Sequence, residues 1–113
     1  MNKYRDKSDF EINVRIANIL LEYGQVANVM HINEDVLIFD KNSKSSIFNP
    51  CNNPTDAMPI VIDNKISLRA PSITDRWKAE FVDEYGNYVG YRRALNKNPY
   101  RAAMEIFLMM KNG

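Results

Sequence analysis

The sequence predicts an α+β fold in which a small antiparallel sheet packs against an N-terminal and a C-terminal helix. Apolar residues recur at helical spacing near both ends of the chain, and short strand-like segments separated by turn residues lie between them. A length of 113 residues suits one hydrophobic core, and no repeat or linker divides the chain. We therefore expect a single domain over residues 1–113, of which the polar residues 1–7 are frayed.

The first helix is expected to run from Asp9 to about Tyr23. Ser8 and Glu11 have the spacing of a capping box, in which the serine caps the helix and the glutamate lies at its third position. Gly24 ends the helix, because glycine readily adopts the left-handed conformation that follows a last turn. Apolar residues cover most of its circumference, so we expect this helix to be buried on more than one side or to meet a partner.

A β-hairpin is expected next. Residues 26–32 alternate and are rich in β-formers, residues 33–35 supply a turn, and residues 36–39 return as a second strand. The second strand carries apolar side chains on both of its faces, which is typical of a central strand. The polar residues 40–47 are expected to form an exposed loop.

A stiff polar loop, residues 49–56, follows. Two prolines flank its centre, and because proline fixes its own backbone and restricts the preceding residue, ordering this loop costs little entropy. We take it as the candidate binding site, with Asn49, Cys51, Asn52, Asn53 and Asp56 as its residues. The alternative is that its amide side chains satisfy backbone groups of the loop itself.

Residues 57–63 fit two structures. A short helix would begin at Asp56 as its N-cap, place Pro59 at the third position and end at Asn64. The three consecutive β-branched residues 60–62 favour a short buried strand instead. We favour the helix.

The C-terminal half predicts three strands and a helix. Residues 66–68, 77–82 and 88–91 are the expected strands, with a turn between the last two. Asn98 is then the expected N-cap of the final helix, with Pro99 at its first position. One side of this apolar helix should pack on the sheet. Its other side either meets a second subunit, in a homodimer, or is covered by the N-terminal helix.

Unusual motifs occur in three parts of the chain. They are Ser8-Asp9-Phe10-Glu11-Ile12-Asn13; Phe48-Asn49-Pro50-Cys51-Asn52-Asn53-Pro54 with Asp56-Ala57-Met58-Pro59-Ile60 and Asn64-Lys65-Ile66-Ser67; and Asn98-Pro99, Arg101-Ala102-Ala103-Met104 and Phe107-Leu108-Met109-Met110. Together they resemble the NinX family of bacteriophage and prophage proteins, over nearly the whole chain. The resemblance implies an origin in a tailed phage or a prophage. It implies no activity, and it carries over no catalytic residue.

Composition restricts the classes of function. A net charge of +1 argues against a strong, sequence-independent grip on nucleic acid, although a local basic patch is compatible with it. The single cysteine excludes an internal disulfide and fits a reducing compartment, so we expect the cytoplasm of a bacterial host cell. No apolar run approaches the length of a membrane span, so no membrane partner is expected. Zinc spacing and glycine-rich phosphate loops are absent from the sequence, and no cofactor or metal is expected.

Two binding hypotheses follow. In the first, the chain is a non-catalytic module that contacts an unknown phage or host protein through the 49–56 loop and the tyrosines Tyr85, Tyr88 and Tyr91. In the alternative, it is a nucleic-acid-binding accessory module. Its basic residues near the start of the last helix, where a helix terminus favours phosphate, would be Arg92, Arg93, Lys97 and Arg101.

The third and weakest hypothesis is a small enzyme that uses the thiol of Cys51 with Asn52, Asp56 or His31. A nucleophilic cysteine needs a base within hydrogen-bond reach and a lowered pKa, and the sequence shows neither.

Overall fold

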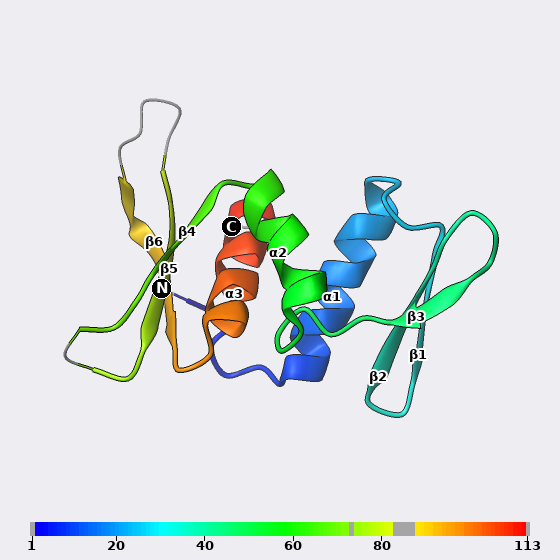
Figure 1. Cartoon of the computed structure of the whole chain (residues 1–113), viewed down its shortest axis with the longest axis horizontal. Coiled ribbons are helices and arrows are strands. Elements are labelled where there is room, and N and C mark those ends of the chain that lie inside the picture. The colour runs from blue at the N-terminus through cyan, green and yellow to red at the C-terminus, as the bar shows by residue number, and fades with distance from the viewer. Residues whose placement is uncertain (1, 73, 83–87, 113) are drawn as a thin grey trace.

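In the part of the chain that the structure describes, three helices lie between two antiparallel sheets of three strands each (Figure 1). The computed structural model describes residues 2–72, 74–82 and 88–112, without the side chains of residues 82, 88–92 and 112. The elements are α1 (Asp9–Glu22), β1 (Asn28–Ile32), β2 (Asp35–Phe39), β3 (Ser45–Ile47), α2 (Pro54–Asp63), β4 (Ile66–Arg69), β5 (Trp77–Val82), β6 (Tyr88–Asn96) and α3 (Pro99–Asn112). The predicted α+β class, with a helix near each end of the chain, is confirmed.

The strands form two sheets and not the one sheet that the sequence predicted. Sheet A contains β1, β2 and β3, and sheet B contains β4, β5 and β6, each in chain order. Each strand pairs with its neighbours in sequence, and α2 separates the two groups along the chain, so each group closes its own sheet. The prediction of a loop over residues 40–47 was wrong at its end, because Ser45–Ile47 pairs with β2 as an edge strand.

Local chemistry sets the ends of α1 and of the first hairpin as predicted. The hydroxyl of Ser8 accepts a hydrogen bond from the backbone N–H of Glu11 at 3.1 Å, which caps α1. Gly24 follows the helix with a φ of 75°, which glycine adopts without strain. In the turn between β1 and β2, Asn33 has a φ of 58°, a conformation that asparagine tolerates.

Residues 57–63 belong to a helix, as favoured, but the predicted N-cap was wrong. The side chain of Asn53 caps α2 by accepting from the N–H of Thr55 at 3.0 Å, so the helix begins three residues earlier than expected. Asp56 does not cap, because its carboxylate accepts from the N–H of Asn49 at 2.9 Å and closes the preceding loop. Pro59 consequently lies inside the helix and not at its third position.

Helix α3 forms the centre of the molecule. It contacts all three strands of sheet B on one side and α1 and α2 on the other (Figure 1). Every residue from 101 to 109 is buried. The apolar surface that the sequence offered to a second subunit is therefore covered within the chain, which favours the intramolecular alternative for this helix.

The N-terminal segment is packed and not frayed. The side chain of Tyr4 is 1% exposed and belongs to the core. The backbone carbonyls of Tyr4 and Lys7 accept hydrogen bonds from Arg101 at 3.0 and 2.6 Å. The sequence prediction of fraying for residues 1–7 therefore fails for residues 4–7, since their anchors lie in α3, more than ninety positions away.

Candidate functional site

The 49–56 loop is closed by its own backbone and by Asp56. The carbonyl of Asn49 accepts hydrogen bonds from the N–H groups of Asn52 and Asn53 at 3.1 and 2.8 Å. The Asp56 carboxylate holds the N–H of Asn49 from the other side. The loop is thus a tight turn that leads directly into the capped start of α2.

A buried asparagine ties this loop to α1. The side chain of Asn13, 6% exposed, donates to the side-chain oxygen of Asn49 at 2.9 Å and accepts from the N–H of Cys51 at 3.2 Å. Both ends of the amide are therefore occupied, as a buried polar group requires. Asn13 lies among the apolar residues of α1, between Ile12 and Val14, and these two bonds explain a buried polar residue at this position.

A second asparagine ties the loop to α3. Asn98 accepts from the N–H of Tyr100 at 2.9 Å, which caps α3 as predicted. Its amide nitrogen donates to the carbonyl of Cys51 at 2.7 Å and to the side-chain oxygen of Asn52 at 2.9 Å. Asn52 in turn donates to Asp9, at the start of α1, at 3.1 Å.

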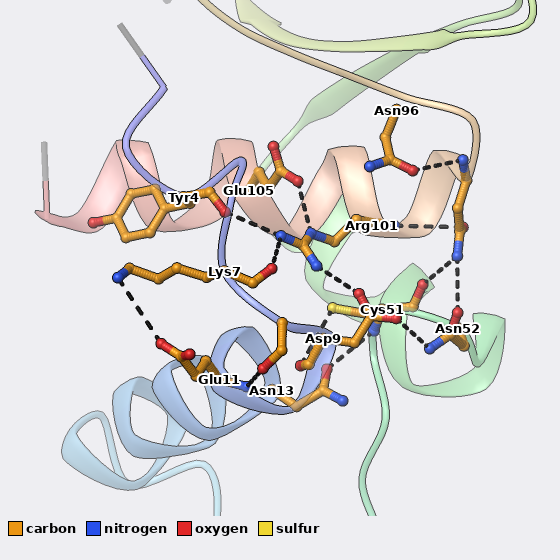
Figure 2. A network of polar contacts seen from close by, with 12 residues as sticks. Tyr4, Lys7, Asp9, Glu11, Asn13, Cys51, Asn52, Asn96, Arg101 and Glu105 are labelled. Atoms are coloured by element: carbon orange, nitrogen blue, oxygen red, sulfur yellow. Dashed lines mark hydrogen bonds and ion pairs between the residues drawn. The ribbon is translucent and has the colours of Figure 1, made fainter.

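Arg101 completes this arrangement, which we call the Arg101 network (Figure 2). Its guanidinium bonds to Glu105 at 2.6 Å and to Asp9, and to backbone carbonyls of the N-terminal segment. Arg101 is 6% exposed and Glu105 is fully buried. Burial alone would lower the pKa of Arg101, but the hydrogen bonds to Asp9 and Glu105 outweigh that effect and raise the pKa. The members of the network are Tyr4, Lys7, Asp9, Asn13, Asn49, Cys51, Asn52, Asn98, Arg101 and Glu105.

Cys51 has none of the features of a nucleophile. Its side chain is fully buried, and its sulfur lies 3.9 Å from the carbonyl oxygen of Asp9. Burial, followed by the negative charge of Asp9, raises the pKa of Cys51 to about 12. The thiol is therefore protonated near neutral pH, and the enzyme hypothesis loses its attacking group.

The buried thiol predicts a specific sensitivity to alkali. Because the pKa of Cys51 is near 9 in the unfolded chain and about 12 in the folded protein, its contribution to stability is complete below pH 9 and is lost as the pH rises towards 12. The loss should approach about 4 kcal/mol at the upper end. Denaturant unfolding at several pH values in this window should show a smaller decline for Cys51→Ala, and equal declines would contradict the prediction.

The structure brings most of the predicted loop residues into one network, and their polar groups bond to other parts of the chain, although Asn52 and Asn53 are exposed. Asn49, Cys51 and Asn52 bond to α1 and α3, Asn53 caps α2 and Asp56 closes the loop. Among the described side chains, no buried nitrogen or oxygen lacks a partner. These contacts favour the structural alternative for the loop, and recognition of a ligand by it stays a prediction.

Two residues of the predicted nucleic-acid-binding cluster have partners within the chain. Arg101 is buried in the network, and Lys97 forms an ion pair with Asp75 at 3.3 Å. Arg93 lies exposed on β6, which extends beyond its predicted end. Arg92 also lies on β6, with its side chain outside the described part. Tyr85 and the side chains of Tyr88 and Tyr91 are outside it as well.

A different basic surface appears on sheet B, on the side that faces away from α3. Register pairs Arg69 with Lys78 and Arg93 with Glu80, so these side chains share one face, while the buried Ala79 and Ala94 share the other. Arg69, Arg76 and Lys78 also line a hollow of about 340 Å³. We call Arg69, Arg76, Lys78 and Arg93 the basic face. Sequence reasoning missed it because register, and not proximity in sequence, assembles these residues.

Among the described residues, no helix combines the length and the apolar character that crossing a membrane requires. In the same residues, no group of three histidine, cysteine, aspartate or glutamate side chains is arranged to hold a metal ion.

Comparison with known proteins agrees with the resemblance seen in the motifs. The family model described as bacteriophage P22 NinX matches residues 3–111, which include all the elements of both sheets and most of α3. No curated protein and no solved structure matches the chain. The chain therefore belongs to the phage NinX family and is a bacteriophage accessory protein.

Proposed function

We propose that this accessory protein is a non-catalytic module that binds the phosphate backbone of nucleic acid through the basic face of sheet B. The observation that supports the proposal is the register of the sheet, which sets Arg69, Lys78 and Arg93 on one side of it, together with Arg76 beside them in the same hollow. Phosphate contacts of this kind position a protein on nucleic acid without reading its sequence. Binding would take place in the cytoplasm of the host cell.

The near-neutral net charge of the whole chain is compatible with this proposal, because the positive charges are concentrated on one face of sheet B. Among the described side chains, the basic face carries four positive groups and the carboxylate of Glu80, which pairs with Lys78 at 3.6 Å. These five side chains sum to about +3, whereas the whole chain has a net charge of +1. The remaining residues therefore carry a small net negative charge, which would orient the basic face towards a polyanion.

The salt dependence of binding tests the proposal. Four phosphate contacts predict that log K falls with log salt concentration with a slope of about −3.6 on duplex DNA and about −2.8 on single strands. Fluorescence anisotropy with short DNA and RNA, single- and double-stranded, measures this slope. Replacing Arg76 and Arg93 together by glutamine should reduce it to about half, because two contacts are removed.

A matched control separates the basic face from general charge effects. Lys41 and Lys44 are exposed in the turn after β2, on sheet A at the other end of the molecule (Figure 1), and Lys41→Gln with Lys44→Gln removes the same number of positive charges. This control should bind almost as the wild type does. Absence of binding at low salt, or an equal loss in the control, would overturn the proposal.

A second candidate is the protein partner expected from the sequence. A hollow of about 340 Å³ lies beside the loop and is lined by both apolar and polar side chains. The lining residues are Leu20, Tyr23, Gln25, Phe48, Thr55, Asp56, Pro59, Ile60, Asp63, Asn64, Phe107 and Lys111. Such mixed lining suits a segment of another phage or host protein. If nucleic acid is not bound, this hollow is the surface to test next.

A further inference from the structure

Sheet A carries apolar side chains on both of its faces. Val29, Val36 and Ile38 share the face that packs on α1, and Val36 is 2% exposed. Register places the next set on the opposite face, where Met30, Leu37 and Ile47 are aligned across the three strands. The apolar members of the outer set are Met30, Ile32, Leu37, Phe39 and Ile47, which we call the apolar face; Asn28, Asp35 and Ser45 lie on the same side, at the ends of the strands.

No element within the described residues covers the apolar face. Sheet A lies at one end of the molecule, with α1 on its inner side (Figure 1). Met30, Ile32 and Ile47 are 46%, 51% and 61% exposed. A three-stranded sheet that is apolar on both sides normally has a second layer, and contiguous exposed patches of this kind mark sites of association.

The charges at the two ends of the apolar face have opposite signs. Glu34 and Asp35 are exposed at the turn between β1 and β2, where Asp35 begins β2. Lys41 and Lys44 are exposed in the turn after β2, at the other end of the strand. Asp40 also lies at that end, but its carboxylate accepts from the backbone N–H groups of its own turn at 2.8 and 2.9 Å. One end is thus acidic and the other has a small excess of positive charge.

This distribution fits a second copy of the chain. A two-fold axis in the plane between two facing sheets, perpendicular to the strands, reverses the strand direction and sets the acidic end of each copy over the basic end of the other. An axis parallel to the strands would set like charges together. Two sheets packed in this way lie about 10 Å apart and interdigitate their inner side chains.

We infer that the protein forms a two-fold symmetric homodimer in which the apolar faces of two copies of sheet A pack with antiparallel strands. The dimer does not involve α3 and does not depend on the function proposed for sheet B. Because sheet B lies at the opposite end of each copy (Figure 1), the dimer presents two basic faces at its two far ends.

Sedimentation velocity over a concentration series of the full chain tests the inference. The wild type should change from monomer to dimer with concentration, and Ile47→Glu should weaken the dimer about tenfold or more, because it buries a charge in the interface. Ile62, 66% exposed on α2, provides the matched control, since Ile62→Glu is the same change outside the apolar face. A monomeric wild type, or equal effects of the two substitutions, would overturn the inference.

Charge reversal tests the strand direction. Glu34→Lys with Asp35→Lys gives a copy that is positive at both ends, and Lys41→Glu with Lys44→Glu gives one that is negative at both ends. Each variant should dimerise less well than the wild type, whereas a mixture of the two should form heterodimers. Circular dichroism checks that both are folded. If each variant dimerises as well as the wild type, the antiparallel arrangement is excluded. DNA binding by the same variants is measured separately and tests the function proposed for sheet B.

Discussion

Replacing Arg101 by methionine should destabilise the folded protein strongly. The substitution removes the guanidinium that pairs with Glu105, whose side chain is fully buried, and with Asp9. Breaking a buried ion pair from one side costs about 3–5 kcal/mol, a large part of the ~5–15 kcal/mol that stabilises a typical domain. Urea unfolding followed by circular dichroism measures the loss.

A second substitution identifies its cause. In the double variant Arg101→Met with Glu105→Met, the buried carboxylate is absent too, so part of the stability should return. Recovery should be incomplete, because the carbonyls of Tyr4 and Lys7 still lack their donor. Arg5→Met, at an exposed position, should change the stability little. A double variant no more stable than the single one would show that the unpaired Glu105 is not the source of the loss.

The second large effect is expected at Tyr4. Its ring is 1% exposed, so Tyr4→Ala removes a large core side chain and should cost about 3 kcal/mol. Tyr23 is 56% exposed, and the same truncation there should cost far less. Urea unfolding of both variants, with Tyr4→Phe to isolate the hydroxyl, makes the comparison. Equal losses for Tyr4→Ala and Tyr23→Ala would show that the N-terminal segment frays after all.

What the sequence predicted correctly rests on local chemistry. The caps Ser8 and Asn98 and the stop at Gly24 act within a few residues of themselves, so their effect can be inferred from spacing. The position of the α2 cap was missed because Asn53 and Asp56 are both good caps. The Asp56 carboxylate accepts a hydrogen bond from the N–H of Asn49, so the side chain of Asn53 is the one that caps the helix.

The parts that failed depend on contacts between distant segments. Arg101 and Glu105 have the spacing of an exposed helical ion pair, and a sequence gives no sign that Asp9 and the carbonyls near Tyr4 surround them. The candidate loop was located correctly as an unusual segment. The bonds of its amides to other segments could not be foreseen, because the partners Asn13 and Asn98 lie 36 and 46 positions away from the residues they bind.

The Arg101 network also predicts an order in which the parts of the molecule fold. Its bond from Arg101 to the Tyr4 carbonyl spans 97 positions, whereas the strand pairs of both sheets join neighbours in sequence. Closing a longer loop costs more entropy before any contact compensates for it, so distant contacts tend to form later. We therefore expect the strands of the two sheets to pair first and the three helices to pack together last. The hydrogen bonds of Arg101 to the N-terminal segment should form in that final step.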